Sequence, residues 1–166
     1  MSILEKVAFR SVLAEDLEVI LKMNNNATPN VSPLTDSDLK WYVDHSDYFQ
    51  VAVINEQVEG FLIALPNGCE YKSVNYIWFS NKYDRFMYVD RVVINPRFSG
   101  NGIGTRLYED LLKFAIPNYP RVTCEVNLKP RNDSSLNFHE NMGFVQVGTQ
   151  WTDNNSKYVS LMSHEF

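Results

Sequence analysis

The chain has 166 residues and a hydrophobic fraction of 45%, so we expect one globular domain spanning 1–166. No apolar run reaches the roughly 18 residues of a membrane span, and the charged start MSILEKVAFRS with only two cysteines, Cys69 and Cys124, fits a cytoplasmic protein rather than a secreted one. A net charge of −5 argues against nucleic acid as a partner, because binding phosphates requires a clustered basic face.

The first third of the chain predicts a strand, two helices and a hairpin, in that order. Residues 6–12, KVAFRSV, alternate as in a half-buried strand. A helix follows, because apolar residues then recur at helical spacing until the polar run 24–26: Leu13, Leu17, Ile20 and Leu21. The stretch TDSD, 35–38, is typical of a capping box and predicts a second, short helix. YFQVAVI and VEGFLIAL, separated by residues 55–57, predict a β-hairpin.

The rest of the chain alternates strands and helices. A dense aromatic segment, 71–86, leads to a strand over 87–94, and residues 103–115 carry apolar positions four apart until Pro117 ends the helix. The strand RVTCEVNL, a short helix closed by Gly143, and the strands FVQVG and KYVSLM complete the chain. This order predicts an α/β fold of the α+β kind, with a mixed, mostly antiparallel sheet of about seven strands and helices on both faces.

Three glycines, at positions 100, 102 and 104 in RFSGNGIGTR, stand at the junction of the strand over 87–94 and the helix over 103–115. Glycines at such a junction let backbone N–H groups and a helix N-terminus approach a diphosphate, although a tight turn alone also favours glycine. A P-loop would need Lys and then Ser or Thr after the last glycine, but Thr105 and Arg106 follow it. The spacing does not fit a Rossmann fingerprint either.

The segment from Arg97 to Gly104 instead resembles the acetyl-CoA loop of the GNAT superfamily of N-acetyltransferases, in which Arg or Gln precedes two residues, Gly, one residue, and Gly or Ala. The preceding VVINP resembles the core strand of that family, and NDSSLNFHENMGF resembles its second motif. YKSVNYIWFS, YVDRVVI, CEVN and FHENMGF further resemble a bacterial subgroup of predicted acetyltransferases. The order of elements also matches the fold of the family over almost the whole chain.

The resemblance implies acetyl-CoA as cofactor and a set of residues that would bind it. The strand backbone would pair with the pantetheine arm, the loop amides would hold the diphosphate, and two later side chains would contact the cofactor. These expected cofactor-binding residues are Val92, Val93, Ile94, Gly100, Asn101, Gly102, Ile103, Gly104, Thr105, Asn132 and His139. Asn132 would equally suit the start of a helix, and Arg97 and Arg106 would add charge or stay solvated.

The resemblance also implies catalytic residues. His139 stands where the family usually places Tyr, and it would donate a proton to the leaving thiolate or accept one from the amine; a packed helix histidine is the structural alternative. Glu125 and Asp90 are the other candidate bases, although Asp90 could instead form a structural ion pair with Arg91 and a water chain could replace both. No spacing of His, Cys, Asp or Glu indicates a metal site.

The expected reaction is acetyl transfer from acetyl-CoA to a primary amine, by direct attack in a ternary complex. The acceptor would be a small-molecule amine or a peptide N-terminus, and the residues expected to line its site are Asn24, Asn25, Tyr76, Trp78 and Phe79. Core packing is the alternative explanation for the aromatic ones. A non-catalytic module that binds or senses acyl-CoA is the alternative function, a longer acyl donor stays open, and the C-terminal strands would suit a homodimer.

Overall fold

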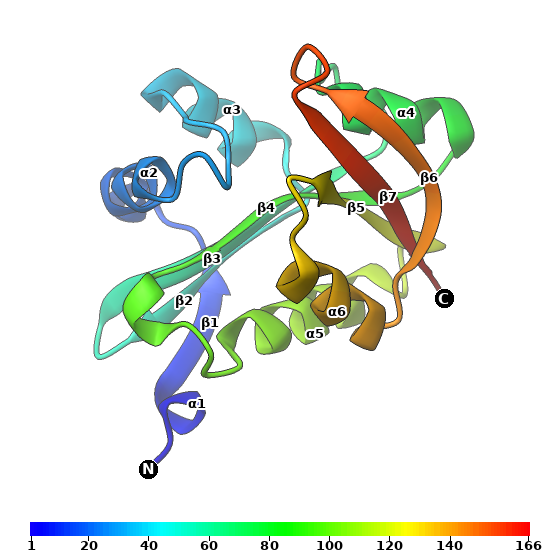
Figure 1. The fold of residues 1–166 in the computed structure, drawn as a ribbon. Helices are drawn as coiled ribbons and strands as arrows, with labels where there is room; N and C mark the ends of the chain where they lie inside the picture. Colours follow the sequence, from blue (N-terminus) through cyan, green and yellow to red (C-terminus); the bar gives the residue numbers. More distant parts are fainter. The chain divides into compact units, whose positions relative to one another are not determined.

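The structure is a computed structural model that describes residues 1–166, and its backbone is organised as seven strands and six helices (Figure 1). The helices are α1 Ile3–Lys6, α2 Leu17–Asn26, α3 Asp36–His45, α4 Val74–Lys82, α5 Ile103–Ala115 and α6 Asp133–Asn141. The strands are β1 Val7–Ser11, β2 Tyr48–Ile54, β3 Gln57–Pro66, β4 Met87–Ile94, β5 Arg121–Lys129, β6 Val145–Thr152 and β7 Lys157–Glu165. Short 3-10 turns cover Ala14–Asp16 and Pro96–Phe98.

The strands pair in the order β1-β2-β3-β4-β5-β7-β6, which confirms the predicted mixed and mostly antiparallel sheet. Pairs β1–β2, β2–β3, β5–β7 and β6–β7 are antiparallel, and β4–β5 is parallel. The β4–β5 pairing joins Met87 to Val122 and Tyr88 to Thr123. A parallel pair needs a long crossover, and α5 lies within the connection that provides it.

The chain divides into two compact units, and we describe each by itself. The first comprises 1–65 and 89–111, and the second comprises 66–88 and 112–166. The expectation of one domain over 1–166 stays a prediction.

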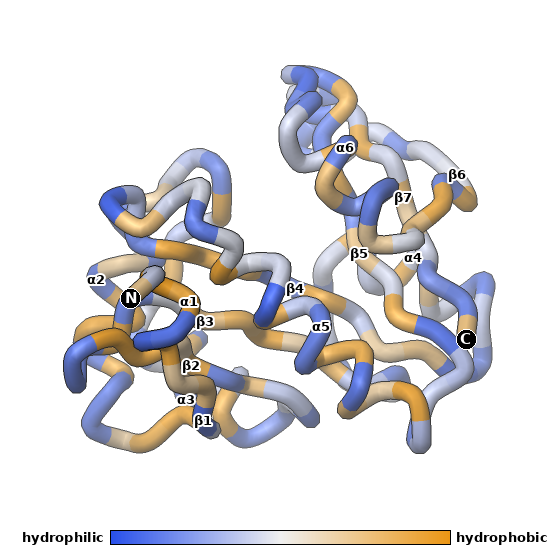
Figure 2. The backbone as a smooth tube through the Cα atoms, turned by 90° about the horizontal axis from the view of Figure 1, so that it is seen from below, coloured by the Kyte–Doolittle hydropathy of each residue, from blue (hydrophilic) through white to orange (hydrophobic).

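The first unit contains β1 to β3, most of β4, helices α1 to α3 and the first part of α5. Figure 1 shows α2 and α3 on one face of its strands and α5 on the other. The β2–β3 hairpin turns through Asn55 and Glu56, which both have positive φ, as a two-residue turn of this kind requires. Its strands supply most of the core of the unit, and Figure 2 shows the hydrophobic colour concentrated along β2 and β3.

The second unit contains α4, the start of β4, and the antiparallel strands β5, β7 and β6, with α6 between β5 and β6 along the chain. Tyr76, Phe79, Phe86 and Tyr88 form a buried aromatic cluster, with ring centroids 5.5–6.1 Å apart. This cluster packs α4 onto the start of β4, because aromatic rings bury a large apolar area each.

Most elements agree with the sequence-based predictions, and two helices were not predicted. Thr35 caps α3 by accepting from the N–H of Asp38, and the carboxylate of Asp38 accepts from the N–H of Thr35, so the capping box is confirmed. The aromatic segment, in contrast, contains α4, whose N-terminus is capped by Ser73. The four-residue helix α1 was also missed. None of the helices combines the length and the hydrophobicity that crossing a membrane requires.

Candidate active site

The segment from Arg97 to Gly104, here called the glycine loop, leads from β4 into α5 inside the first unit. Gly100 and Gly102 have φ of +78° and +81°, a conformation that L side chains adopt at a cost. A Cβ built on Gly100 or on Gly104 would meet no atom within 4 Å, so both glycines face open space. At Gly102 the Cβ would lie at an ordinary contact distance from Leu4. The loop therefore leaves its backbone accessible where side chains would otherwise cover it.

Helix α5 presents its first N–H groups at the end of this loop. The N–H of Arg106 donates to the carbonyl of Gly102 at 3.1 Å, so the amides of Ile103, Gly104 and Thr105 lie ahead of the first bond of this type. Such amides carry the partial positive charge of the helix N-terminus and favour an anion. The loop and the start of α5 therefore offer backbone amides that favour an anion.

Strand β4 runs up to the loop and is the last strand of the first unit. It adjoins β3, and a Cβ on Gly60 of β3 would come within 3.1 Å of the Val93 carbonyl oxygen. No other strand of the first unit pairs with the opposite edge of β4 at Val92 to Ile94. An extended ligand with amide groups, such as a pantetheine arm, pairs with an edge of this kind.

Asp90, one of the candidate bases, forms an ion pair with Arg91. The Asp90 carboxylate accepts from Arg91 Nε at 2.7 Å, and the side chains of both residues are at most 5% exposed. Arg91 also donates to Asn24, to the carbonyl and hydroxyl of Ser32, and to the hydroxyl of Tyr42. These contacts therefore support a structural ion pair with Arg91, which was the alternative to a catalytic role for Asp90.

Asn24 and Asn25, expected to line the acceptor site, hold the loop between α2 and α3. Asn24 is fully buried; its Nδ2 donates to Ser32 O and Asn25 Oδ1, and its Oδ1 accepts from Arg91. The Asn25 amide donates to the Leu34 carbonyl and accepts from the Leu34 N–H. These side chains position the loop, and their own polar atoms are engaged within the first unit.

Glu125 lies on β5 in the second unit and is bound by Tyr88 of β4. The Tyr88 hydroxyl lies 2.9 Å and 2.7 Å from the two carboxylate oxygens, and Glu125 itself is half-buried. The hydroxyl therefore fixes the position of the carboxylate. The contact of Tyr88 with Glu125 was not predicted, because a contact between residues 37 positions apart leaves no local sequence pattern.

The second motif forms α6 in the second unit, and Asn132 is its N-cap. The side-chain oxygen of Asn132 accepts from the N–H of Ser135 at 3.1 Å, which leaves its NH₂ group unused by the cap. The capping role was the structural alternative for this residue, and the two roles use different atoms of one amide.

His139 lies in α6, only 5% exposed, between the rings of Phe138 and Phe144. Its Nδ1 is 2.7 Å from the carbonyl oxygen of Ser135, which can only accept, so Nδ1 carries the proton in this arrangement. The neutral ring then has its lone pair on Nε2. Burial lowers the pKa of His139 below its usual value, and the hydrogen bond to Ser135 partly opposes this effect. The ring is thus suited to accept a proton through Nε2.

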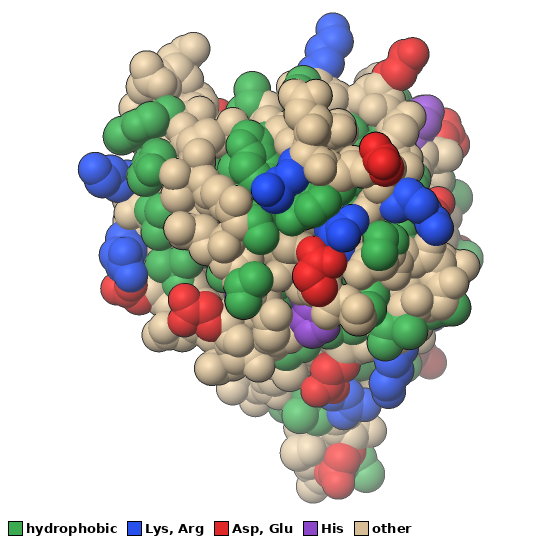
Figure 3. All heavy atoms as spheres, turned by 90° about the vertical axis from the view of Figure 1, so that its right-hand side faces the viewer, with side chains coloured by type: hydrophobic (Ala, Val, Ile, Leu, Met, Phe, Trp, Pro, Cys, Tyr) green, Lys and Arg blue, Asp and Glu red, His purple; other side chains and the backbone are tan.

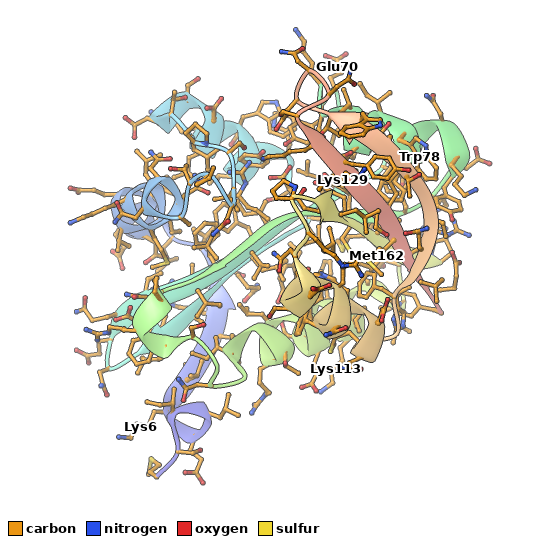
Figure 4. All side chains as sticks on the ribbon, in the orientation of Figure 1. Lys6, Glu70, Trp78, Lys113, Lys129 and Met162 are labelled. Carbon is orange, nitrogen blue, oxygen red and sulfur yellow. The ribbon has the colours of Figure 1, made fainter.

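The aromatic residues expected at the acceptor site differ in exposure. Tyr76 and Phe79 are buried in the core of the second unit, and burial raises the pKa of Tyr76 to about 12. The Tyr76 hydroxyl donates to the Pro66 carbonyl at 2.6 Å. Trp78 is half-buried and projects from α4 toward β6 (Figure 4), where its ring covers Gly148. Core packing accounts for the first two rings, and Trp78 keeps an accessible part.

The predicted residues therefore fall into two groups. The first unit brings together the glycine loop, the end of β4, Asp90, Asn24 and Asn25. The second unit holds Asn132, His139, Glu125 and the aromatic residues of α4. On the face that Figure 3 shows, charged side chains of both signs are interspersed among apolar ones.

Comparison with known proteins identifies the family. The sequence profile of the Acetyltransferase (GNAT) family matches residues 16–144. The search of curated proteins found no significant match. Ard1 from Thermoplasma volcanium has a similar structure, with a TM-score of 0.79 at 16% identity over 96% of this chain and 97% of that one.

Two solved structures from Arabidopsis thaliana are similar over almost their whole length. NAA60 in complex with acetyl-CoA has a TM-score of 0.78 at 17% identity, over 96% of this chain and 99% of that one. Naa50 with the bisubstrate analogue CoA-Ac-MVNAL has a TM-score of 0.74 at 16% identity, over 97% and 99%. Identities this low establish a shared fold, whereas the profile match covers most of the sequence. The chain belongs to the GNAT acetyltransferase family.

Proposed function

We propose that this protein is an acetyl-CoA-dependent N-acetyltransferase that acetylates a primary amine by direct attack in a ternary complex. The observation that carries the proposal is the glycine loop, in which two left-handed glycines open the backbone ahead of the helix α5 N-terminus. Membership of the GNAT family supports the same reaction. So do the CoA ligand of the NatC complex and the acetyl-CoA of NAA60, two structures with this fold.

Acetyl-CoA supplies an activated acetyl group as a thioester. The amides of residues 100–105 would bind its diphosphate, and the backbone of Val92 to Ile94 would pair with the pantetheine arm. The N–H groups near Val93 would also polarise the thioester carbonyl, as donors that need no reorganisation during the reaction. Asn132 would contribute the NH₂ group that its cap leaves unused.

His139 would accept the proton that the ammonium group must lose before it attacks. An amine with a pKa near 10.4 is protonated at neutral pH, so a base is required. The proton on Nδ1 is bonded to Ser135 and the lowered pKa keeps the ring neutral, so Nε2 carries a lone pair and has no proton to donate to the leaving thiolate. Of the two roles expected from the sequence, we therefore propose the basic one.

Glu125 would bind the incoming ammonium through its carboxylate, which the Tyr88 hydroxyl holds in place. Asp90 contributes less in this proposal, since Arg91 engages its carboxylate. Asn24 and Asn25 would act on the acceptor through the α2–α3 loop that they hold. Trp78 would line the acceptor site with its accessible ring, and Tyr76 and Phe79 would support it from the core of the second unit.

The acceptor would be a peptide N-terminus or a small-molecule amine. The NatC complex was crystallised with a Gag peptide and CoA, and Naa50 with the bisubstrate analogue CoA-Ac-MVNAL, which supports a peptide as one class of acceptor. Amine panels that include short peptides, polyamines and amino acids, with release of free thiol as the readout, would identify the class. A non-catalytic acyl-CoA-binding module would bind CoA and release no thiol with any amine.

The cofactor assignment is tested with two alanine substitutions that match in backbone conformation. Gly100→Ala and Gly68→Ala each place a Cβ at positive φ, +78° and +86°, with no atom within 4 Å. Both should cost roughly 1 kcal/mol of stability. Only Gly100→Ala should weaken CoA binding, by about tenfold or more in calorimetry, because its methyl group occupies the space of the diphosphate. No detectable CoA binding by the wild type would overturn the proposal.

The role of His139 is tested with His139→Gln. Turnover should fall by about a hundredfold or more, the usual contribution of a positioned acid or base, while the Kd of CoA changes little. The pH dependence of kcat should lose the limb that reflects loss of the neutral imidazole at low pH. Unchanged turnover across the pH range would remove His139 from the mechanism and leave the cofactor assignment intact.

A further inference from the structure

Glu59 is a buried carboxylate that is hydrogen-bonded to the turn at the start of the glycine loop. It lies on β3 and is 6% exposed. Its Oε2 accepts from Asn95 Nδ2 at 2.7 Å, and its backbone carbonyl accepts from the N–H of Asn95 at 2.8 Å. A buried carboxylate needs such donors, because it is costly to remove a charge from water without them.

Asn95 transmits this contact into the turn Pro96–Phe98. Its Oδ1 accepts from the N–H of Arg97 at 3.2 Å, and its backbone carbonyl accepts from the N–H of Phe98 at 2.8 Å. One amide side chain thus binds Glu59 through its NH₂ group and caps the turn through its oxygen. The turn ends two residues before Gly100.

Arg97 closes the same arrangement from the surface. Its Nη2 lies 3.4 Å from Glu59 Oε1, and its guanidinium lies 4.7 Å from the centre of the Phe98 ring. The side chain of Arg97 is 68% exposed and that of Glu59 is 8% exposed, so the ion pair itself contributes little. Next to Glu59, Gly60 permits the close approach of β3 to Val93 and Ile94.

We propose that Glu59, acting through Asn95, is a positioning residue that sets the conformation of the glycine loop for the diphosphate of acetyl-CoA. The inference rests on the proposed function and concerns Glu59, which neither the family motifs nor the expected cofactor contacts include. Charge alone predicts the opposite effect, since a carboxylate near a diphosphate repels it. The two explanations therefore predict opposite changes in CoA affinity when Glu59 is removed.

The test measures the Kd of CoA by calorimetry for wild type, Glu59→Ala and Glu59→Gln. Glu59→Ala should weaken CoA binding about tenfold, the size expected when part of a charge-assisted hydrogen bond is lost. Glu59→Gln keeps an acceptor for Asn95 and should restore the Kd to within about threefold of wild type. Tighter binding by Glu59→Ala would overturn the proposal in favour of simple electrostatics.

Pantetheine, which lacks the diphosphate, separates positioning of the loop from general loss of structure. Its affinity, measured by NMR titration, should change less than about twofold in Glu59→Ala. An equal loss for pantetheine and CoA would show a structural defect and contradict the proposal. If Glu59→Ala does not fold, Asn95→Ala, at a half-buried turn position, should give the same selective loss.

A matched charge control completes the design. Glu109→Gln removes a negative charge from an exposed position of α5 in the same unit, and it should leave the Kd of CoA within about twofold. Unchanged CoA affinity in both Glu59→Ala and Asn95→Ala would overturn this inference while the proposed function stands. Failure of the wild type to bind CoA would overturn both.

Discussion

Arg91 of β4 shows how one side chain can fix two helices, α2 and α3, and the loop between them. Its N–H groups donate one hydrogen bond each to Asp90, Asn24 and Tyr42 and two to Ser32. Three separate segments, namely α2, the α2–α3 loop and α3, thus meet at one guanidinium. The planar fork of arginine suits such a site, and lysine, a point charge on a flexible stem, does not.

Arg91→Lys should therefore lower the free energy of unfolding by about 3 kcal/mol, because several buried acceptors lose their donors while the charge remains. Urea denaturation measures this change. Arg106→Lys, at an exposed position of α5, is the matched control and should stay within about 0.5 kcal/mol of wild type. A similar loss in both variants would contradict the role of the buried network.

His139 links stability to pH through its lowered pKa. A histidine whose pKa is lower in the folded state than in the unfolded one binds fewer protons when folded. Its contribution is fully present above the unfolded pKa, near 6.5, and is lost as the pH falls toward the folded value. The stability difference between wild type and His139→Gln should thus shift against wild type as the pH falls from about 7.5 to about 5.

Urea denaturation at several pH values checks this prediction. If wild type and His139→Gln lose stability in parallel over this pH range, His139 does not titrate as its burial indicates.

At the scale of elements, helix α4 is the longest helix that the sequence did not predict. Aromatic and β-branched residues such as Tyr76, Ile77 and Trp78 lack strong helix propensity, so the segment showed no helical pattern that outweighed its aromatic density. Its tertiary contacts decide the conformation, since Tyr76 and Phe79 are buried against the start of β4. Propensity is a weak prior wherever packing of this kind is available.

The candidate site also combines features that local sequence predicts with contacts that it does not predict. The glycine loop was predictable because positive φ and open backbone leave a local signature, and Gly100 and Gly102 have that conformation. The contacts of Glu59 with Asn95 and of Tyr88 with Glu125 were not, because they join residues 36 and 37 positions apart. Short sequence patterns record turns and caps, whereas pairs of this kind depend on strand register.

The packing of α4 on β6 gives a prediction at this scale. A Cβ on Gly148 would clash with Cζ2 of Trp78, so Gly148→Ala should force the indole away and destabilise the protein by about 2 kcal/mol. In the Trp78→Ala background the same substitution should cost less than about 1 kcal/mol, because the clash is gone. A double-mutant cycle in urea measures both values, and additive effects would contradict the contact.

The two units of the whole molecule are joined within regular elements. The boundary falls between Tyr88 and Val89 inside β4, and between Leu111 and Leu112 inside α5, and a third crossing lies at the end of β3. Domains that unfold independently are usually connected by exposed linkers. Unfolding either unit here disrupts a strand and a helix that the other also uses. We therefore expect one cooperative transition.

The three tryptophans allow that expectation to be tested, since Trp41 lies in the first unit and Trp78 and Trp151 lie in the second. The Trp41→Phe protein reports on the second unit by fluorescence, and the Trp78→Phe/Trp151→Phe protein reports on the first. In each protein the fluorescence transition in urea should coincide with the transition in circular dichroism, as two-state unfolding requires. CoA at about a hundred times its Kd should then raise the unfolding free energy reported by either probe by about 2.7 kcal/mol, because a ligand that binds the folded state stabilises all that unfolds with it. A shift confined to the Trp41 signal would show that the units unfold separately, with CoA bound to the first alone.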